Sequence, residues 1–216
     1  MNKYKLDLHI HSILSSDGGI DKKDLEYIFE NKILDYIAIT DHNEIEFAQS
    51  MQEYFPGRII VGEEIKTSQG EIIGLYLKEK INKGMTIAQT LKAIKSQGGL
   101  SYIPHPYSER RHGIGPLLLD VFHDMVDFIE SYNGRAILGI SNKKAIEFVA
   151  QKKLVHATNS DAHSKRGIGK VYNLISAAPT KETLVSLLES AEHITGRAPL
   201  AEYLSPTLNR LSKRFK

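Results

Sequence analysis

The 216-residue sequence contains no cysteine and no tryptophan, and its charges nearly balance, with 28 Lys and Arg against 26 Asp and Glu. The lack of cysteine excludes disulfide bonds, thiolate zinc fingers, iron–sulfur clusters and cysteine nucleophiles. A net charge of +2 argues against a strongly basic nucleic-acid scaffold and an acidic disordered chain. Without a signal-peptide pattern or an apolar run of about 18 residues, we expect a cytoplasmic protein that does not contact the membrane. Histidine, in contrast, is plentiful, with nine residues.

Short apolar runs alternate with amphipathic stretches along the chain, which indicates repeated strand–helix units and a parallel sheet. The length fits one domain over 1–216, with a motif-bearing core at about 5–169 and a helical tail at about 199–216 whose basic face we expect to be solvated. Strands are predicted over Lys5–His11, Tyr36–Thr40, Ile59–Val61, Ile72–Leu77, Leu100–Ile103, Val126–Tyr132 and Val155–Thr158, with a further candidate at Leu174–Ala177. Helices are predicted over Ile20–Asn31, Thr86–Gln97, Ser141–Lys152 and Lys181–His193.

Local signals support several of these elements. Asp21 is placed to cap the first helix, and Thr86 with Gln89 has the spacing of a capping box. Thr180 is a plausible cap for the last predicted helix. The exception to the strand–helix series is the pair of apolar runs on either side of Ser68-Gln69-Gly70, which predicts a hairpin.

The first predicted strand ends in two histidines. His9 and His11 are two residues apart, so their side chains project to the same face of the strand. Asp17 follows in the next loop, where it can reach the same place. For this pair alone, a metal site and two surface histidines are equally good interpretations.

Two further strands end in adjacent polar pairs. Asp41 and His42 face opposite sides of a regular strand, so one of them is expected to bind a metal and the other to orient a ligand. The same alternation applies to Glu63 and Glu64, of which at most one is a natural ligand.

The remaining candidates follow the fifth and seventh predicted strands. His105 lies between two prolines, which predicts an extended backbone at this histidine. Asp161 and His163 repeat the same-face spacing of the first strand. Because function gathers at the carboxyl ends of parallel strands, these polar residues together predict a metal centre there.

Five ordered motifs resemble those of the PHP (polymerase and histidinol phosphatase) domain family. They are His9-x-His11 with Asp17, Thr40-Asp41-His42, Gly62-x-Glu64, His105-Pro106 and Ser160-Asp161-x-His163. The phrases Ile129-Glu130-Ser131-Tyr132-Asn133 and Ser160-Asp161-Ala162-His163 are similar to those of the small stand-alone TrpH/YciV group.

The resemblance implies a distorted (β/α)7 barrel, an α/β fold, with two or three divalent ions at its mouth and a metal-bridging hydroxide that hydrolyses phosphoesters. The ligands that it implies are His9, His11, Asp17, His42, Glu64, His105, Asp161 and His163. Glu64 would bridge two ions, and Asp41 and Glu63 would support them. Where other members have a further His or Cys after the sixth strand, this chain has Glu130, Asn133 and Arg135. Imidazole and carboxylate ligands suit Mn, Fe or Zn.

The expected substrate is a small phosphomonoester, a nucleotide or an oligonucleotide end. Arg110 and Arg111, directly after His105, are the first candidates to bind its phosphate, with Arg135 and Arg166 as second candidates. Two alternatives are a histidinol-phosphatase-like enzyme and a non-catalytic PHP-like binding or accessory module. No obligate protein partner is evident.

Overall fold

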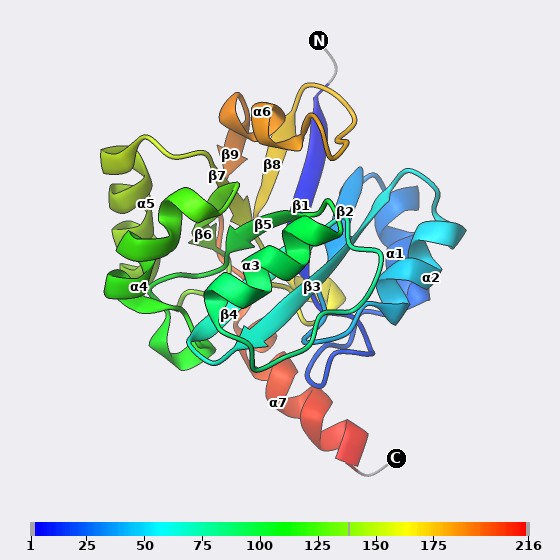
Figure 1. Ribbon diagram of the computed structural model, residues 1–216. Helices are drawn as coiled ribbons and strands as arrows, with labels where there is room; N and C mark the ends of the chain where they lie inside the picture. The colour runs from blue at the N-terminus through cyan, green and yellow to red at the C-terminus, as the bar shows by residue number, and fades with distance from the viewer. Residues whose placement is uncertain (1–2, 138, 215–216) are drawn as a thin grey trace.

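The computed structural model describes residues 3–137 and 139–214. One nine-stranded sheet, in the order β7-β6-β5-β4-β3-β2-β1-β8-β9, curves into a nearly closed barrel with helices around it, as the resemblance implies (Figure 1). The strands are β1 (Tyr4–Ile10), β2 (Tyr36–Ile39), β3 (Ile59–Thr67), β4 (Gly70–Leu75), β5 (Leu100–Ile103), β6 (Phe128–Asn133), β7 (His156–Asn159), β8 (Tyr172–Ile175) and β9 (Glu192–Ile194). The helices are α1 (Lys22–Glu30), α2 (Glu46–Tyr54), α3 (Ile87–Ser96), α4 (Gly115–Phe122), α5 (Ile140–Lys152), α6 (Leu184–Glu189) and α7 (Leu200–Arg214).

The sheet is buried on both faces, which explains its apolar runs. On β2, Ile37 and Ile39 belong to one apolar cluster and Ala38, between them, belongs to another. Tyr102 and Phe128 stack with ring centroids 4.6 Å apart in the second cluster. Strands packed on both sides need apolar residues at successive positions rather than at alternate ones.

The predicted elements are largely confirmed. Asp21 caps α1, and Thr86 and Gln89 form the predicted capping box at the start of α3. β3 and β4 form the predicted antiparallel hairpin, with Thr67 opposite Gly70 at its turn.

The prediction for the last segment before α7 was wrong in its extent. The helix α6 covers only Leu184–Glu189, and its N-cap residue is Thr183 instead of Thr180. His193 lies in β9, opposite Asn173 of β8, and its ring lies 4.1 Å from that of His156. Strand pairing and ring contact therefore override the helical pattern at this end, as tertiary contacts commonly do. α2, α4 and β9 are additional to the predicted elements.

The sheet closes where β1 approaches β7, and hydrogen bonds between these two segments form a seam in the barrel. The main-chain N–H of His11 donates to the carbonyl of Ala162 over 2.9 Å. Three residues earlier on the same seam, the N–H of Leu8 donates to the side chain of Asn159. The seam thus brings the carboxyl ends of β1 and β7 side by side.

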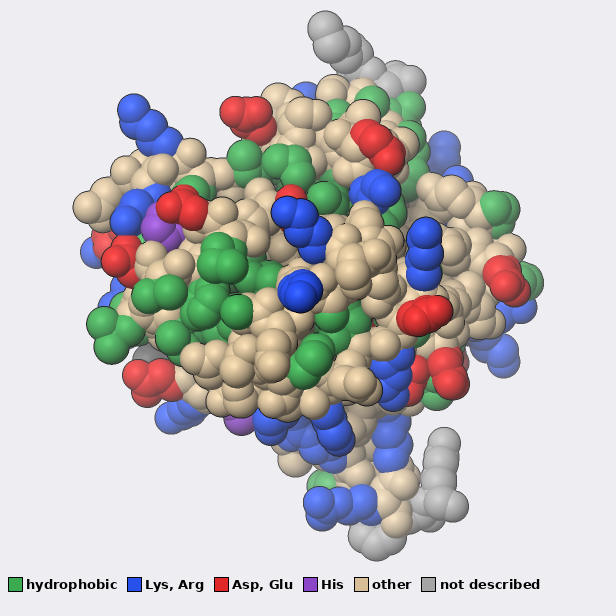
Figure 2. Space-filling model, viewed as in Figure 1, with side chains coloured by type: hydrophobic (Ala, Val, Ile, Leu, Met, Phe, Trp, Pro, Cys, Tyr) green, Lys and Arg blue, Asp and Glu red, His purple; other side chains and the backbone are tan. Residues whose placement is uncertain are grey.

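α7 lies across the end of the barrel at which these strands finish (Figure 1). Lys and Arg side chains gather at this lower edge of the molecule (Figure 2). Within the described part of the chain, we find no helix with the length and apolar character needed to cross a membrane.

Candidate metal centre

His9 and His11 lie side by side at the carboxyl end of β1, as their spacing predicts. Both are fully buried, and their Nε2 atoms are 3.2 Å apart. The Nδ1 atom of His9 lies 3.1 Å from Glu130. A carboxylate on one ring nitrogen holds the proton there, so the Nε2 atom of His9 is left to accept a cation.

Glu130 contacts both His9 and His105. In addition to His9, its carboxylate accepts hydrogen bonds from the main chain of His105 over 2.7 Å and from the side chains of Asn133 and Asn159 over 2.9 Å each. With both oxygens occupied in this way, Glu130 fixes the orientation of His9 and the position of His105.

At the end of β2, His42 turns into the barrel mouth and Asp41 turns away. The Nδ1 atom of His42 lies 3.0 Å from Glu64, and its Nε2 atom lies 3.6 Å from Asp17. Asp41 accepts a 2.6 Å hydrogen bond from the main chain of Ser12 and a second bond from its hydroxyl. Asp41 therefore holds the loop that follows β1.

Glu64 is the residue that most of the cluster faces. Its carboxylate lies 3.0 Å from His42 and 3.0 Å from His105, and within 3.5 Å of His9. Burial would raise the pKa of Glu64, but the surrounding imidazoles hold it well below its usual value. Glu63 faces the other side, where it accepts a hydrogen bond from the main chain of Ile81.

Glu71 joins this group, although the sequence reasoning did not propose it. The residue lies on β4, and its carboxylate is 3.8 Å from His42 and 3.9 Å from His105. β4 runs back from the hairpin turn, so its first residues, and not its last, lie at the mouth. The signal was available, because Glu71 directly follows the predicted turn. Burial and the nearby Glu64 raise the pKa of Glu71 to about 9.

His105 meets the centre through an unexpected backbone conformation. Its φ angle is 28°, so the prediction of an extended backbone between two prolines was wrong. The main-chain N–H of His105 donates to Glu130, and its carbonyl accepts from Ser108 over 2.9 Å, which together hold the strained turn. The Nε2 atom of His105 points at Glu64.

Asp161 and His163, after β7, complete the cluster across the seam from β1. Asp161 has a φ angle of 53° and lies 3.4 Å from the Nε2 atom of His11. The Nδ1 atom of His163 lies 2.9 Å from the carbonyl of Asp161, which leaves Nε2 to face Asp17 at 3.4 Å. Burial lowers the pKa of His163 to about 4, so this imidazole is neutral at pH 7, as a metal ligand must be.

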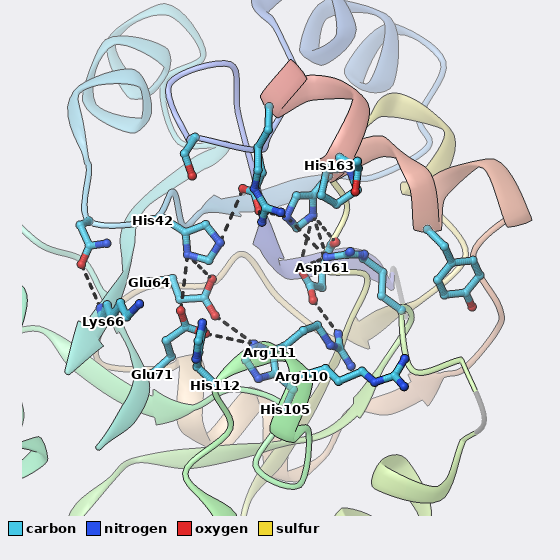
Figure 3. Close-up of a pocket in the computed structure, with 18 residues that line it drawn as sticks. His42, Glu64, Lys66, Glu71, His105, Arg110, Arg111, His112, Asp161 and His163 are labelled. Atoms are coloured by element: carbon cyan, nitrogen blue, oxygen red, sulfur yellow. Dashed lines mark hydrogen bonds and ion pairs between the residues drawn. The ribbon is translucent and has the colours of Figure 1, made fainter. Parts of the chain in front are cut away.

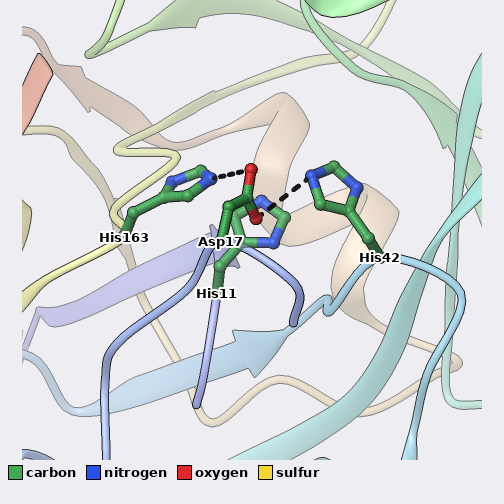
Figure 4. Close-up of side chains that lie close together, drawn as sticks. All are labelled: His11, Asp17, His42 and His163. Carbon is green, nitrogen blue, oxygen red and sulfur yellow. Dashed lines mark ion pairs between the residues drawn. The ribbon is translucent and has the colours of Figure 1, made fainter. Parts of the chain in front are cut away.

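The donor atoms form four overlapping groups, each within 4.8 Å. The groups are His11, Asp17, His42 and His163; His9, His11 and Asp161; His9, Glu64 and His105; and His42, Glu64 and Glu71. Figure 4 shows the first of these, with Asp17 between His42 and His163. Buried imidazole and carboxylate atoms that converge in this way fit divalent ions of the Mn, Fe and Zn type. All eight residues proposed as ligands, and Glu71, lie in these groups.

The centre opens into a cavity of about 390 Å³, which we call the mouth cavity (Figure 3). Its wall includes five cationic side chains, those of Lys66, Arg110, Arg111, Arg135 and Arg210. Arg111 lies 2.8 Å and Arg135 3.5 Å from Asp161. Arg166 does not line this cavity.

α7 supplies contacts that the sequence reasoning missed. The basic face of this helix is not simply solvated, because Arg210 lies 2.6 Å from Asp17 and Lys213 donates to the carbonyls of Ser15 and Gly18. Fully buried Glu202 accepts from the main chain of His163 over 2.6 Å. The helix therefore holds the two loops that carry Asp17 and His163.

Comparisons with known proteins agree with this architecture. Residues 139–192 match a family model described as PHP-associated. The protein MJ1587 of Methanocaldococcus jannaschii is 35% identical over 162 residues, which span 68% of this chain and 95% of that protein.

Solved structures resemble the fold at low sequence identity. A two-domain protein from Bacteroides vulgatus that contains a predicted PHP-like metal-dependent phosphoesterase has a TM-score of 0.72 and 17% identity, over 97% of this chain and 70% of that one. A lesion-specific endonuclease from Pyrococcus furiosus has a TM-score of 0.67 and 15% identity, over 89% of this chain and 58% of that one.

Proposed function

The chain belongs to the PHP domain family, and on this premise we propose that it is a metal-dependent phosphoesterase that hydrolyses a phosphomonoester, a nucleotide or an oligonucleotide end. The observation that carries the proposal is the convergence of nine imidazole and carboxylate side chains, all buried except the partly exposed His42, beneath a cavity lined by five cations. The Bacteroides vulgatus protein, which contains a predicted PHP-like phosphoesterase, and the Pyrococcus furiosus endonuclease support the same reaction class.

We propose that the donor groups hold two or three divalent ions. Glu64 belongs to two groups, as a bridging carboxylate would, and His42 belongs to two as well. Glu71 is a carboxylate ligand candidate in addition to the eight that the family resemblance implies. A third metal ion could therefore be bound without Glu130 as a ligand. Divalent ions bound here would supply an activated water and positive charge for the phosphoryl oxygens.

The chain's own residues prepare this chemistry by orientation and charge. Glu130 and the carbonyl of Asp161 hold the outer nitrogens of His9 and His163, so that each Nε2 atom faces the centre. Arg111 and Arg135 stand at the edge of the donor groups, where their guanidinium groups would bind the non-bridging oxygens of a phosphate. Arg110 has no ion-pair partner among the described residues and faces the same cavity.

The test is elemental analysis of the purified protein together with hydrolysis of p-nitrophenyl phosphate after addition of Mn²⁺. We expect bound divalent metal, and a rate that falls at least 100-fold in His9→Ala and Glu64→Gln. His123→Gln is the matched control, because His123 packs on Phe148 away from the donor groups. Absence of metal and of hydrolysis in the wild type would leave a non-catalytic module as the better interpretation.

A further inference from the structure

A second cavity, of about 560 Å³, adjoins the mouth cavity. We call it the side pocket. It shares Arg110, Arg111, Arg135 and Tyr203 with the wall of the mouth cavity, so the two spaces meet along these side chains. In Figure 3, Arg111 is directed at Asp161, whereas Arg110 extends away from the donor groups. A volume of this size is within the range of small-molecule sites.

The two cavities differ in chemistry. The side pocket adds Tyr107, Ile137 and Ile140, none of which lines the mouth cavity. Ile137 is 61% and Ile140 is 59% exposed, so apolar surface is open to solvent immediately beside a charged site. Exposed apolar side chains that line a cavity and adjoin a polar centre indicate a ligand that has an apolar part and a charged part.

The tyrosine rings and arginine guanidinium groups of the side pocket indicate which kind of apolar group a ligand would place there. Tyr107 lies in the loop after β5 and Tyr203 lies on α7, and the ring of Tyr107 contacts that of Phe148 edge-on with ring centroids 6.5 Å apart. Tyrosine rings and arginine guanidinium planes stack on planar aromatic groups more favourably than on flexible polyols. The wall also contains one carboxylate, Glu109, against three arginines, which favours an anionic connection to the mouth.

We propose that the side pocket binds an aromatic group on the alcohol side of the phosphate ester, so that the substrate is an aromatic-bearing phosphate and not the phosphate of a small polar alcohol. This inference rests on the proposed phosphoesterase function. In the reaction, water adds to phosphorus, the P–O bond to the alcohol breaks, and the alcohol oxygen takes up a proton. The products are inorganic phosphate and the free aromatic-bearing alcohol.

The first test compares two substrates that share a primary alkyl leaving oxygen, adenosine 5′-monophosphate and glycerol 1-phosphate. Because their intrinsic reactivities are similar, the ratio of their kcat/KM values reports on the side pocket. We expect a ratio of at least 10 in favour of the adenosine ester, and a fall of about 5- to 100-fold in this ratio for Tyr203→Ala and for Ile140→Ala. Leu204→Ala, an exposed neighbour on α7 outside both cavities, is expected to leave both rates unchanged.

The second test measures binding without turnover. Isothermal titration of adenosine 5′-monophosphate into the metal-free protein is expected to show binding that weakens at least 5-fold in Tyr203→Ala and not in Leu204→Ala. If this holds while no ester is hydrolysed under any metal, the side pocket stands and the proposed phosphoesterase function fails. If both esters are hydrolysed equally, or if the variants bind adenosine 5′-monophosphate like the wild type, the side-pocket inference is overturned and the phosphoesterase function stands.

Discussion

Replacement of Glu202 by alanine tests whether α7 is part of the metal centre. The carboxylate is fully buried in a helix outside the sheet, and it accepts from the main chain of His163 over 2.6 Å and of Ser164 over 3.1 Å. It also accepts from the hydroxyl of Ser164. Among the residues that the structure describes, Glu202 is the only acceptor for these two main-chain donors, and Glu202→Ala removes it.

The magnitude follows from those donors. A buried donor left without a partner costs about 1–3 kcal/mol, so two donors set a range of about 2–6 kcal/mol. Ser164 is only partly buried, and water that reaches it reduces the upper value to about 4 kcal/mol. For a chain of this length, the corresponding fall in Tm is about 4–16 °C. Both main-chain donors use Oε1, so Glu202→Gln can keep the acceptor of both and changes only the Oε2 contact with the Ser164 hydroxyl. We therefore expect Glu202→Gln to lose less stability than Glu202→Ala.

The assay is thermal unfolding of the metal-free protein, followed by competition for Mn²⁺ or Zn²⁺ with a chromophoric chelator. Glu202→Ala is expected to bind metal more weakly than the wild type, because His163 loses the contact that positions it. Leu204→Ala, which removes an exposed side chain from the same helix, is the control. A fall in Tm of less than 2 °C with unchanged metal affinity would refute the reasoning.

Three further predictions concern single side chains. Glu71→Gln is expected to lower the metal content and yet to raise the Tm of the metal-free protein at pH 8, because the folded-state pKa of Glu71 is raised to about 9 and the wild type loses stability as pH rises from 4.5 toward 9; unchanged metal content would exclude Glu71 as a ligand. Burial and the neighbouring His156 lower the pKa of His193 to about 4, so its contribution to stability is present above pH 6.5 and is lost as pH falls toward 4. The Tm of His193→Gln relative to that of the wild type should therefore rise as pH falls from 6.5 to 4. Parallel plots of Tm against pH for the two proteins would contradict the lowered pKa of His193. Thr86→Ala removes the cap of α3 and should cost about 0.5–2 kcal/mol in urea unfolding, whereas Thr86→Ser should cost little.

The sequence predicted the parts of the site that depend on strand ends. Strand periodicity places His9 and His11 on one face, and alternation separates His42 from Asp41 and Glu64 from Glu63. The face of a strand on which a side chain lies depends only on neighbouring residues, so it can be predicted from the sequence.

The missing parts depend on contacts between distant segments. Glu71 reaches the centre because an antiparallel strand presents its beginning at the mouth, and Glu202 does so because α7 folds back across the barrel. The conformation of His105 is set by Glu130, which is 25 residues away in the sequence. Propensity and periodicity do not determine such packing.

The seam between β1 and β7 has a consequence for how the chain folds. Leu8 and Asn159, which meet there, are 151 positions apart in the sequence, so this seam closes only after the strands between them have been ordered. Contacts between such distant segments slow folding, because the entropy of a long loop is lost before they form. His11 and Asp161 stand on opposite sides of the seam, so an ion held between them would tie the first strand to the seventh. Bound metal would then stabilise the contact between β1 and β7 and slow the unfolding of the barrel.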